Sequence, residues 1–406
     1  MLRSAALLAA SFLALPALAG DPAPALKTRV GDKADRLKAG GGDDHTEAAV
    51  KAGLLWLARH QANDGSWRAE KFSAECVDAG CTGDGLPEFD TGETGLALLA
   101  FLGAGIGPNF AETWRDPATA RDVKPGEIVK RGAEWLEKQQ NQDGAFGPRN
   151  ASKVMYNHAV ATAAMCELYA LTKDGAWKPS AEAGVDFLLA ARNPAGAWRY
   201  SPMCGDNDTS VTSWCVHALH AALAGGLEVD EEGVKGALAW VKRVTDQDYG
   251  RVGYTAKGTG KVIIMGKNED WEHHETLTAA GMLTRLYAGA KPGSRVLDNG
   301  AKLLVCDLPV KEDAAKVDSY YWYYGTEALW ECHGPETKYW KAWNTTMKKA
   351  VVGSQQGGTD CDAGSWDPAR DRWGCEGGRI FSTVMGVMTL EVYYRWPEGG
   401  HGEEGK

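Results

Sequence analysis

The stretch "KAGLLWLARHQANDGSW" (residues 51–67) joins an apolar helical pattern to a turn that ends in Gly-x-Trp. Leu54, Leu57 and Ala58 recur at helical spacing, which predicts one buried stripe on a helix. Asn-Asp-Gly at 63–65 is turn-forming sequence that ends this helix. The stretch therefore predicts an amphipathic helix and a tight turn, with an aromatic side chain directly after the turn.

The same pattern returns along the chain. Related stretches are "RGAEWLEKQQNQDGAF" at 131–146, "EAGVDFLLAARNPAGAW" at 182–198 and "TTMKKAVVGSQQ" at 345–356, the last followed by Gly-Ser-Trp at 364–366. Each precedes a second apolar run, such as "TGLALLAFLGAG" at 94–105. A helix pair cannot bury both of its faces alone, so repeated pairs must stack on their neighbours. Six pairs, weaker in the fourth and fifth copies, predict an all-α ring of six inner and six outer helices.

The pattern K-A-x-x-x-W-L-x-x-x-Q-x-x-x-G-x-W at 51–67 resembles the QW repeat of squalene–hopene cyclases and of protein-prenyltransferase β subunits. The likeness spans residues 46–396 and is clearest in the first two copies, while the third copy has Arg192 in place of Gln. The resemblance implies an α/α toroid, the (α/α)6 barrel. We expect Gln61 and Gln140 to bind free backbone groups at helix ends, and the aromatic residues to pack between neighbouring pairs.

The two ends of the chain differ in composition from the repeats. Residues 1–19 carry one cation, an apolar run and Ala-Leu-Ala at 17–19, which predicts a signal peptide and a secreted or periplasmic protein. Residues 20–45 and 397–406 are polar and rich in Gly, and we expect a flexible N-terminal tail and a polar C-terminal tail. The toroid is predicted to occupy residues 46–396.

The charge and hydropathy of the chain bear on its partners. The net charge of −10 comes without a basic stripe, which is atypical of nucleic-acid binders. No segment after the signal peptide reaches the length of a membrane span, so the mature chain is predicted to have no transmembrane segment.

The nine cysteines raise the questions of disulfides and of metal binding. Export favours disulfides. The pairs Cys76–Cys81 and Cys361–Cys375 are predicted, because these cysteines lie in loop-like sequence. Protein prenyltransferases hold zinc with Asp, Cys and His, and Cys-His-Gly at 332–334 resembles the zinc motif of lanthionine cyclases. The sequence does not match the remaining residues of either zinc site, so it predicts no metal site and identifies no cofactor.

In a ring of antiparallel pairs, all inner helices begin on the same face. We expect the functional site at this rim, beside the positive ends of the helix dipoles, although Asp, Ser and Thr there are also ordinary N-caps. Five consecutive aromatic residues at 320–324 cover every direction of a helix, so some of them must face the centre. The candidate catalytic residues are Asp208, Asp206, His158, His274 and Arg379. The candidate ligand-binding residues are Glu93, Tyr156, Thr212, Trp214, Tyr320, Tyr321, Trp322, Tyr324 and Phe381.

Asp-Asn-Asp-Thr at 206–209 resembles the Asp-x-Asp-Asp-Thr motif with which squalene–hopene cyclases protonate a carbon–carbon double bond. This chain is one acid short. If the first two acids align, Asp208 occupies the position of the proton donor. If the threonines align, Asn207 replaces the donor, and both alignments stay open.

These patterns favour a toroid that binds an apolar or aromatic-friendly ligand in its cavity or rim, such as an isoprenoid, another lipid or a glycan, without classical cyclase chemistry. The alternative is an enzyme that uses acids at the rim, either similar to a terpene cyclase or isomerase or active as a polysaccharide lyase or hydrolase.

Overall fold

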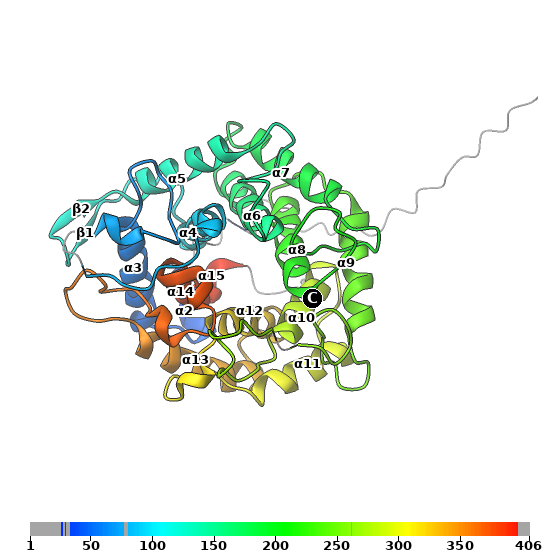
Figure 1. Ribbon diagram of the computed structural model, residues 1–406. Helices are drawn as coiled ribbons and strands as arrows, with labels where there is room; N and C mark the ends of the chain where they lie inside the picture. Colours follow the sequence, from blue (N-terminus) through cyan, green and yellow to red (C-terminus); the bar gives the residue numbers. More distant parts are fainter. Residues whose placement is uncertain (1–25, 27–28, 30–32, 77–79, 261, 397–406) are drawn as a thin grey trace, which may run out of the picture.

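A computed structural model describes Leu26, Arg29 and residues 33–76, 80–260 and 262–396. Its centre is a closed ring of six helices (Figure 1), in which each inner helix contacts the next and the last contacts the first. The inner helices are α4 (Asp90–Gly103), α6 (Val154–Thr172), α8 (Thr209–Ala224), α10 (Thr276–Tyr287), α12 (Ser319–His333) and α14 (Gly374–Leu390). The predicted all-α toroid is thereby confirmed.

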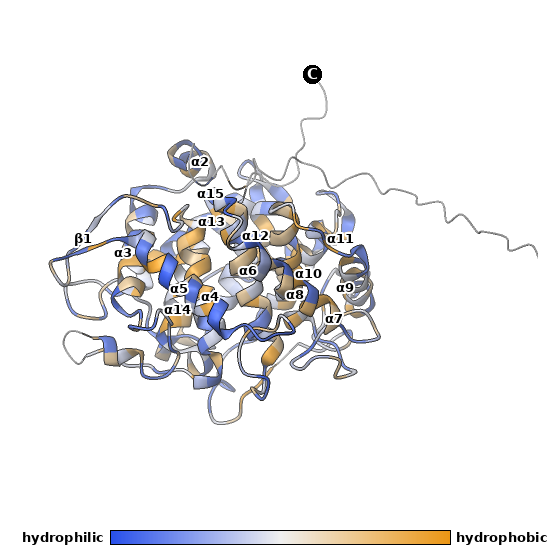
Figure 2. Ribbon diagram, turned by 90° about the horizontal axis from the view of Figure 1, so that it is seen from above, coloured by the Kyte–Doolittle hydropathy of each residue, from blue (hydrophilic) through white to orange (hydrophobic). Residues whose placement is uncertain are grey.

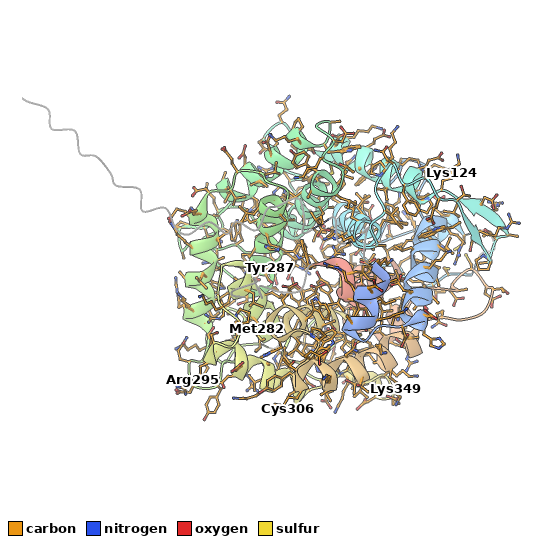
Figure 3. All side chains as sticks on the ribbon, turned by 180° about the vertical axis from the view of Figure 1, so that it is seen from behind. Lys124, Met282, Tyr287, Arg295, Cys306 and Lys349 are labelled. Carbon is orange, nitrogen blue, oxygen red and sulfur yellow. The ribbon has the colours of Figure 1, made fainter. Side chains whose placement is uncertain are left out.

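A second set of helices surrounds this ring and alternates with it along the chain. The outer helices are α3 (Asp44–Arg59), α5 (Pro125–Gln139), α7 (Lys178–Ala190), α9 (Glu231–Val244), α11 (Arg295–Val305) and α13 (Lys338–Ser354). Figure 3 shows Lys124, Arg295 and Lys349 at the periphery and Tyr287 of α10 nearer the centre.

Figure 2 shows many hydrophilic residues on the outer helix α5 and hydrophobic residues on the inner helices α8 and α10. Inner helices are covered on both sides, and nearly all residues of α6 are buried. A helix that is apolar all round requires such surroundings. None of the described helices combines the length and the apolar character needed to cross a membrane.

In the first, second and sixth pairs, a glutamine joins the turn to the following pair. The side-chain amide of Gln61 donates to the carbonyl oxygens of Gly65 and Ile128, both at 2.9 Å. Gln355 in the sixth pair donates in the same way to Gly364, at 2.9 Å, and to Ala49 of the first pair, at 2.8 Å. The same local pattern therefore also closes the ring.

The glycine and the tryptophan of the turn have separate tasks. Gly65 adopts φ of +100°, and a Cβ atom there would lie 2.4 Å from the carbonyl oxygen of Arg131. Only glycine fits this left-handed, closely packed position. Trp67 is fully buried, and its indole N–H donates to the carbonyl of Leu57 at 2.8 Å, which folds the aromatic ring back onto the preceding helix.

Shorter elements complete the chain. They are helix α2 (Lys33–Gly40), helix α15 (Val392–Arg395), the antiparallel strands β1 (Trp114–Asp116) and β2 (Arg121–Val123), and 3-10 turns at Phe72–Glu75, Pro87–Phe89, Ala314–Lys316 and Pro368–Arg370. The sequence predicted a flexible tail over residues 20–45. This is wrong for residues 33–40, because α2 packs on α15 and buries Leu37. The predicted signal peptide and the predicted C-terminal tail lie outside the described residues.

A buried ion cluster fills the ring towards the C-terminal ends of the inner helices. Arg29 pairs with Glu167 at 2.7 Å, and Arg395 pairs with Glu167 at 3.1 Å and with Glu391 at 3.0 Å. All four side chains are fully buried, so the charges compensate one another away from water. This cluster leaves the opposite face, where the inner helices begin, for a site.

Candidate functional site

A pocket of about 170 Å³ lies at the face where the inner helices begin. Every inner helix contributes to its wall, through Glu93, Tyr156, Trp214, Thr276, Tyr320 and Phe381. The helix starts that the sequence singled out therefore converge on a single pocket.

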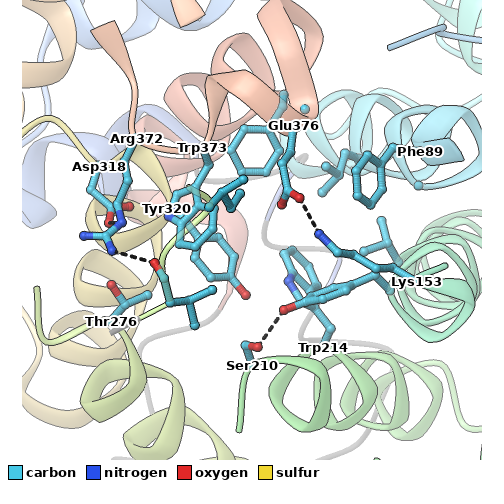
Figure 4. A pocket seen from close by; sticks show the side chains of 18 of the residues that line it. Phe89, Lys153, Ser210, Trp214, Thr276, Asp318, Tyr320, Arg372, Trp373 and Glu376 are labelled. Atoms are coloured by element: carbon cyan, nitrogen blue, oxygen red, sulfur yellow. Dashed lines mark hydrogen bonds and ion pairs between the residues drawn. The ribbon is translucent and has the colours of Figure 1, made fainter. Parts of the chain in front are cut away.

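Aromatic side chains form much of the pocket wall (Figure 4). The Tyr320 ring stacks at 6.5 Å on Trp214 and meets Trp373 edge-on at 6.3 Å, and Phe381 lies at 6.5 Å. Aliphatic side chains, including those of Leu96, Val160 and Leu277, add to this lining. A ligand with extended apolar surface matches such a wall.

The charged groups at the rim are paired with each other. Lys153 lies 2.5 Å from Glu376, and Arg372 lies 3.9 Å from Asp318 (Figure 4). Arg372 also donates to the backbone carbonyl of Val262 at 3.0 Å, which ties the loop between α9 and α10 to the pocket. Because these charges compensate one another, the rim does not require a charged ligand.

Glu93 in α4 is a buried acid in the pocket wall. Its side chain is 3 % exposed, and Oε2 has no hydrogen-bond partner among the described residues. Burial, reinforced by the charge of Asp90, raises the pKa of Glu93 well above its usual range. Since an unpaired buried carboxylate is costly, the surroundings of Glu93 favour its neutral, protonated form.

His274 and Asp307 form a hydrogen-bonded pair of titratable side chains at the pocket. Nδ1 of His274 lies 2.8 Å from Asp307 Oδ2, whereas Nε2 is buried without a described partner on a residue that lines the pocket. Burial alone lowers the pKa of His274, but the hydrogen bond to Asp307 and the nearby acidic charges raise it overall. The ring stacks on Tyr321 at 4.9 Å, and the Tyr321 hydroxyl donates to the backbone carbonyl of Asp307 at 2.8 Å.

Asp208 lies behind the pocket wall and holds a network of hydroxyl groups. It caps α8 by accepting from the Val211 N–H at 2.8 Å, and it accepts from Ser210 at 2.9 Å and from Tyr254 at 3.4 Å. Tyr156 donates to Ser210 at 2.6 Å. Burial raises the pKa of Asp208 to about 6, against the opposing effect of the hydrogen bonds from Val211 and Ser210. Asp208 is therefore an N-cap and the acceptor of this hydroxyl network, and it is not among the residues that line the pocket.

The structure divides the predicted ligand-binding residues into two groups. Those that line the pocket are Glu93, Tyr156, Trp214, Tyr320 and Phe381; those that do not are Thr212, Tyr321, Trp322 and Tyr324. Of the aromatic run 320–324, only Tyr320 reaches the pocket. Tyr321 instead supports His274, and Thr212 donates to the backbone carbonyl of Trp198 at 3.3 Å.

Among the predicted catalytic residues, only His274 lines the pocket. His158 is fully engaged, since Nδ1 accepts from the Phe146 N–H at 3.2 Å and Nε2 lies 3.0 Å from the Gly184 carbonyl. Burial lowers the pKa of His158 to about 3, so it is neutral. Arg379 donates to the carbonyl of Thr82 at 2.7 Å, outside the pocket. The Asp206 side chain is 76 % exposed.

Several wall residues were not identified from the sequence. They are Lys153, Tyr200, Tyr254, Asp318, Arg372, Trp373 and Glu376, with Asp307 behind them. Asp318 lies two residues before the aromatic run, and residues 372–376 lie at the start of α14, so both are close in sequence to segments that the helical pattern predicts. Tyr200 and Tyr254 lie in loops, and Asp307 follows an outer helix, where periodicity gives no guidance.

The predicted disulfides Cys76–Cys81 and Cys361–Cys375 are not formed, and no disulfide joins any two cysteines of the described chain. Cys76, Cys81 and Cys361 instead converge on His60. This group is the one set of described side chains arranged to hold a metal ion, and none of its members lines the pocket.

Comparison with solved structures finds the same architecture in other proteins. The α-1,6-mannanase GH76A of Salegentibacter sp. HEL1_6 matches with a TM-score of 0.55 at 12 % identity, over 86 % of this chain and 99 % of that chain. An inactive variant of the mannanase in complex with α-1,6-mannotriose matches with a TM-score of 0.53 at 14 % identity, over the same shares. The type II terpene cyclase MstE from Scytonema matches with a TM-score of 0.50 at 14 % identity, over 86 % and 97 %.

This chain shares the α/α toroid fold with both enzymes. At these identities the similarity establishes the fold and leaves the chemistry to the site. No protein-family model matches the sequence, and a search of curated proteins found no significant match.

Proposed function

We propose that this chain is an exported enzyme that binds a largely apolar, unsaturated ligand of the isoprenoid type in its central pocket and transfers protons to and from it. One observation carries the proposal: a buried acid, Glu93, and an imidazole hydrogen-bonded to a carboxylate, His274, line the same aromatic pocket, each with a buried polar atom left without a described partner. The apolar leader at residues 1–19 supports export.

Glu93 is suited to the role of general acid. A carbon–carbon double bond is a very weak base, so its protonation needs an acid that is neutral at working pH and shielded from water. Burial raises the pKa of Glu93 and so favours this form. The positive charge that develops on carbon would face the rings of Trp214, Tyr320 and Phe381, whose π faces stabilise cations.

His274 is suited to the role of base. When the ring is neutral, the Nδ1–H donated to Asp307 leaves the lone pair on Nε2, the atom without a described partner. This lone pair would accept a proton from the cationic intermediate, which restores a double bond elsewhere in the ligand. Protonation by one residue and deprotonation by another amounts to isomerisation or cyclisation without a net change in composition.

The test is incubation of the purified chain with squalene and with polyprenols in deuterated water. We expect products of unchanged composition that have incorporated deuterium at carbon. Glu93→Gln keeps the shape of the side chain and removes the acid, so the rate should fall about 100-fold or more. Glu327→Gln is the matched control, because Glu327 is also buried in an inner helix but lies outside the pocket.

Deuterium incorporation that persists unchanged in Glu93→Gln would refute the acid role. Failure of the chain to bind or convert any of these isoprenoids would refute the choice of ligand.

Glycan processing is the second candidate, since Glu376 and Asp318 place two carboxyl groups beside aromatic surfaces that suit sugar rings. Release of new reducing ends from α-1,6-mannan, abolished by Glu376→Gln and not by Glu93→Gln, would establish this function in place of proton transfer to an alkene.

A further inference from the structure

Four metal-ligating side chains meet at one point outside the pocket. They belong to His60, Cys76, Cys81 and Cys361, and their ligand atoms all lie within 4.8 Å of one another. Nε2 of His60 lies 3.4 Å from the Cys76 sulfur and 3.5 Å from the sulfurs of Cys81 and Cys361. One nitrogen is thus nearly equidistant from three sulfurs.

These distances match a tetrahedral zinc site. With Zn–N bonds of about 2.0–2.1 Å and Zn–S bonds of about 2.3 Å, tetrahedral angles place nitrogen and sulfur about 3.5–3.6 Å apart. Three thiolates and one imidazole also form one of the ligand sets typical of structural zinc. We infer that His60, Cys76, Cys81 and Cys361 bind a structural zinc ion.

The surroundings of His60 orient the ring for this role. Nδ1 lies 2.8 Å from the backbone carbonyl of Trp56, and an Nδ1–H donated there leaves the lone pair on Nε2, towards the sulfurs. The imidazole stacks on the Trp56 indole at 4.1 Å and also contacts Phe72. A backbone acceptor that fixes the ring and tautomer of a ligating histidine is a usual companion of protein zinc sites.

Burial and spacing agree with a structural ion. His60 is 1 % exposed and Cys81 is 7 % exposed, while Cys76 and Cys361 are half-buried. Four protein ligands saturate a tetrahedral ion and leave no position for a substrate, so the site is independent of the pocket chemistry. The spacing Cys-x4-Cys at 76–81 lies within the range of zinc-binding cysteine pairs.

The cluster lies where the ring closes. His60 ends the first outer helix, Cys76 and Cys81 belong to the insertion that follows the first turn, and Cys361 lies in the turn of the sixth pair. Next to it, Arg59 donates to the backbone carbonyl of Ala363 at 2.5 Å. An ion held here fastens the first pair to the last and anchors the insertion to both.

Zinc accounts for the cluster better than a disulfide. A disulfide would join two of the three sulfurs and leave His60 beside the third thiol, whereas zinc engages all four groups. In an oxidising compartment, zinc binding would also protect these thiolates from oxidation.

The test is elemental analysis of the full chain, purified without reductant and without a metal-affinity step. We expect about one zinc per chain, lost on chelation and restored by zinc alone. Cys361→Ser and His60→Gln should lose the bound zinc. Cys204→Ser, which removes an exposed cysteine outside the cluster, should keep it.

A second readout covers the case in which the ligand variants fail to fold. Cobalt added to the chelated wild-type chain should give the visible absorption of a tetrahedral thiolate complex, and chelation should lower the thermal unfolding midpoint. A chain that binds neither zinc nor cobalt after reduction would overturn the inference. So would a natively exported chain without zinc in which peptide mapping finds two of the three cysteines joined by a disulfide.

Discussion

Asp208→Asn should make the stability of this protein less dependent on pH. The Asp208 carboxyl is buried at the N-terminus of α8, where it accepts from the Val211 N–H at 2.8 Å. Burial raises the pKa of Asp208 from its ordinary 3.8 to about 6. Asn caps a helix as well as Asp does, so this variant removes the titration and keeps the cap.

The magnitude follows from the two pKa values. A carboxyl whose pKa is raised by folding contributes stability that is fully present below the unfolded-state pKa and is lost as the pH rises through the folded-state pKa. At about 1.4 kcal/mol per pH unit, the full loss is about 3 kcal/mol. Between about pH 4.5 and about pH 7.5, linkage gives a loss of about 2 kcal/mol.

The assay is urea unfolding of the wild-type chain and of Asp208→Asn at these two pH values. Taking the difference between the two proteins cancels the titration of other buried acids, such as Asp371 and Glu327, whose pKa values burial also raises. The free energy of unfolding of the Asn variant, taken relative to wild type, should rise by about 2 kcal/mol from the lower to the higher pH. Asp208→Ala should in addition lose about 1 kcal/mol of capping energy at both.

A stability difference between wild type and Asp208→Asn that does not change with pH would refute the reasoning, because it would mean that Asp208 titrates alike in the folded and unfolded chains. Activity is measured on the same samples. Since Asp208→Asn keeps the cap, a change in its activity would report on the hydroxyl network that Asp208 holds.

Two further predictions concern the site and the ring closure. Asp307→Asn should lower the pKa of His274, since it removes the acceptor that offsets burial; NMR titration of labelled histidine measures this, and an unchanged pKa would contradict the pairing. Gln355→Ala should destabilise the fold by about 1–3 kcal/mol, because it removes two partly buried hydrogen bonds, one of them to the first pair. Urea unfolding measures this loss, with Gln356→Ala as the control, and equal losses in the two variants would contradict a specific role of Gln355.

The aromatic run 320–324 illustrates how far the sequence could locate the site. Helical periodicity required that some of these side chains face the centre, and Tyr320 does so. It could not decide which, because periodicity gives the relative directions of side chains but not the rotation of the helix about its axis. That rotation is set by packing, which sends Tyr321 behind His274 instead.

The cysteines show a different limit. Cys76 and Cys81 are close in sequence, and the predicted export made a local disulfide the natural prediction. Their partners His60 and Cys361 lie elsewhere in the chain, the latter about 300 residues away, so the metal-ligand set exists only when the ring closes. The pairing of His274 with Asp307 has the same origin, since it joins the start of an inner helix to the end of an outer one.

The sequence by itself determined the helices, the turns and the face of the ring where a site would form. These depend on short-range physics: apolar spacing, a glycine that reaches positive φ at residue 65, and glutamines that bind the backbone four residues ahead. Only the tertiary structure decided which acids have a raised pKa, which imidazole is hydrogen-bonded to a carboxylate and which cysteines converge on His60. Burial and convergence are properties of the closed ring, because both arise from contacts between residues that are far apart in the chain.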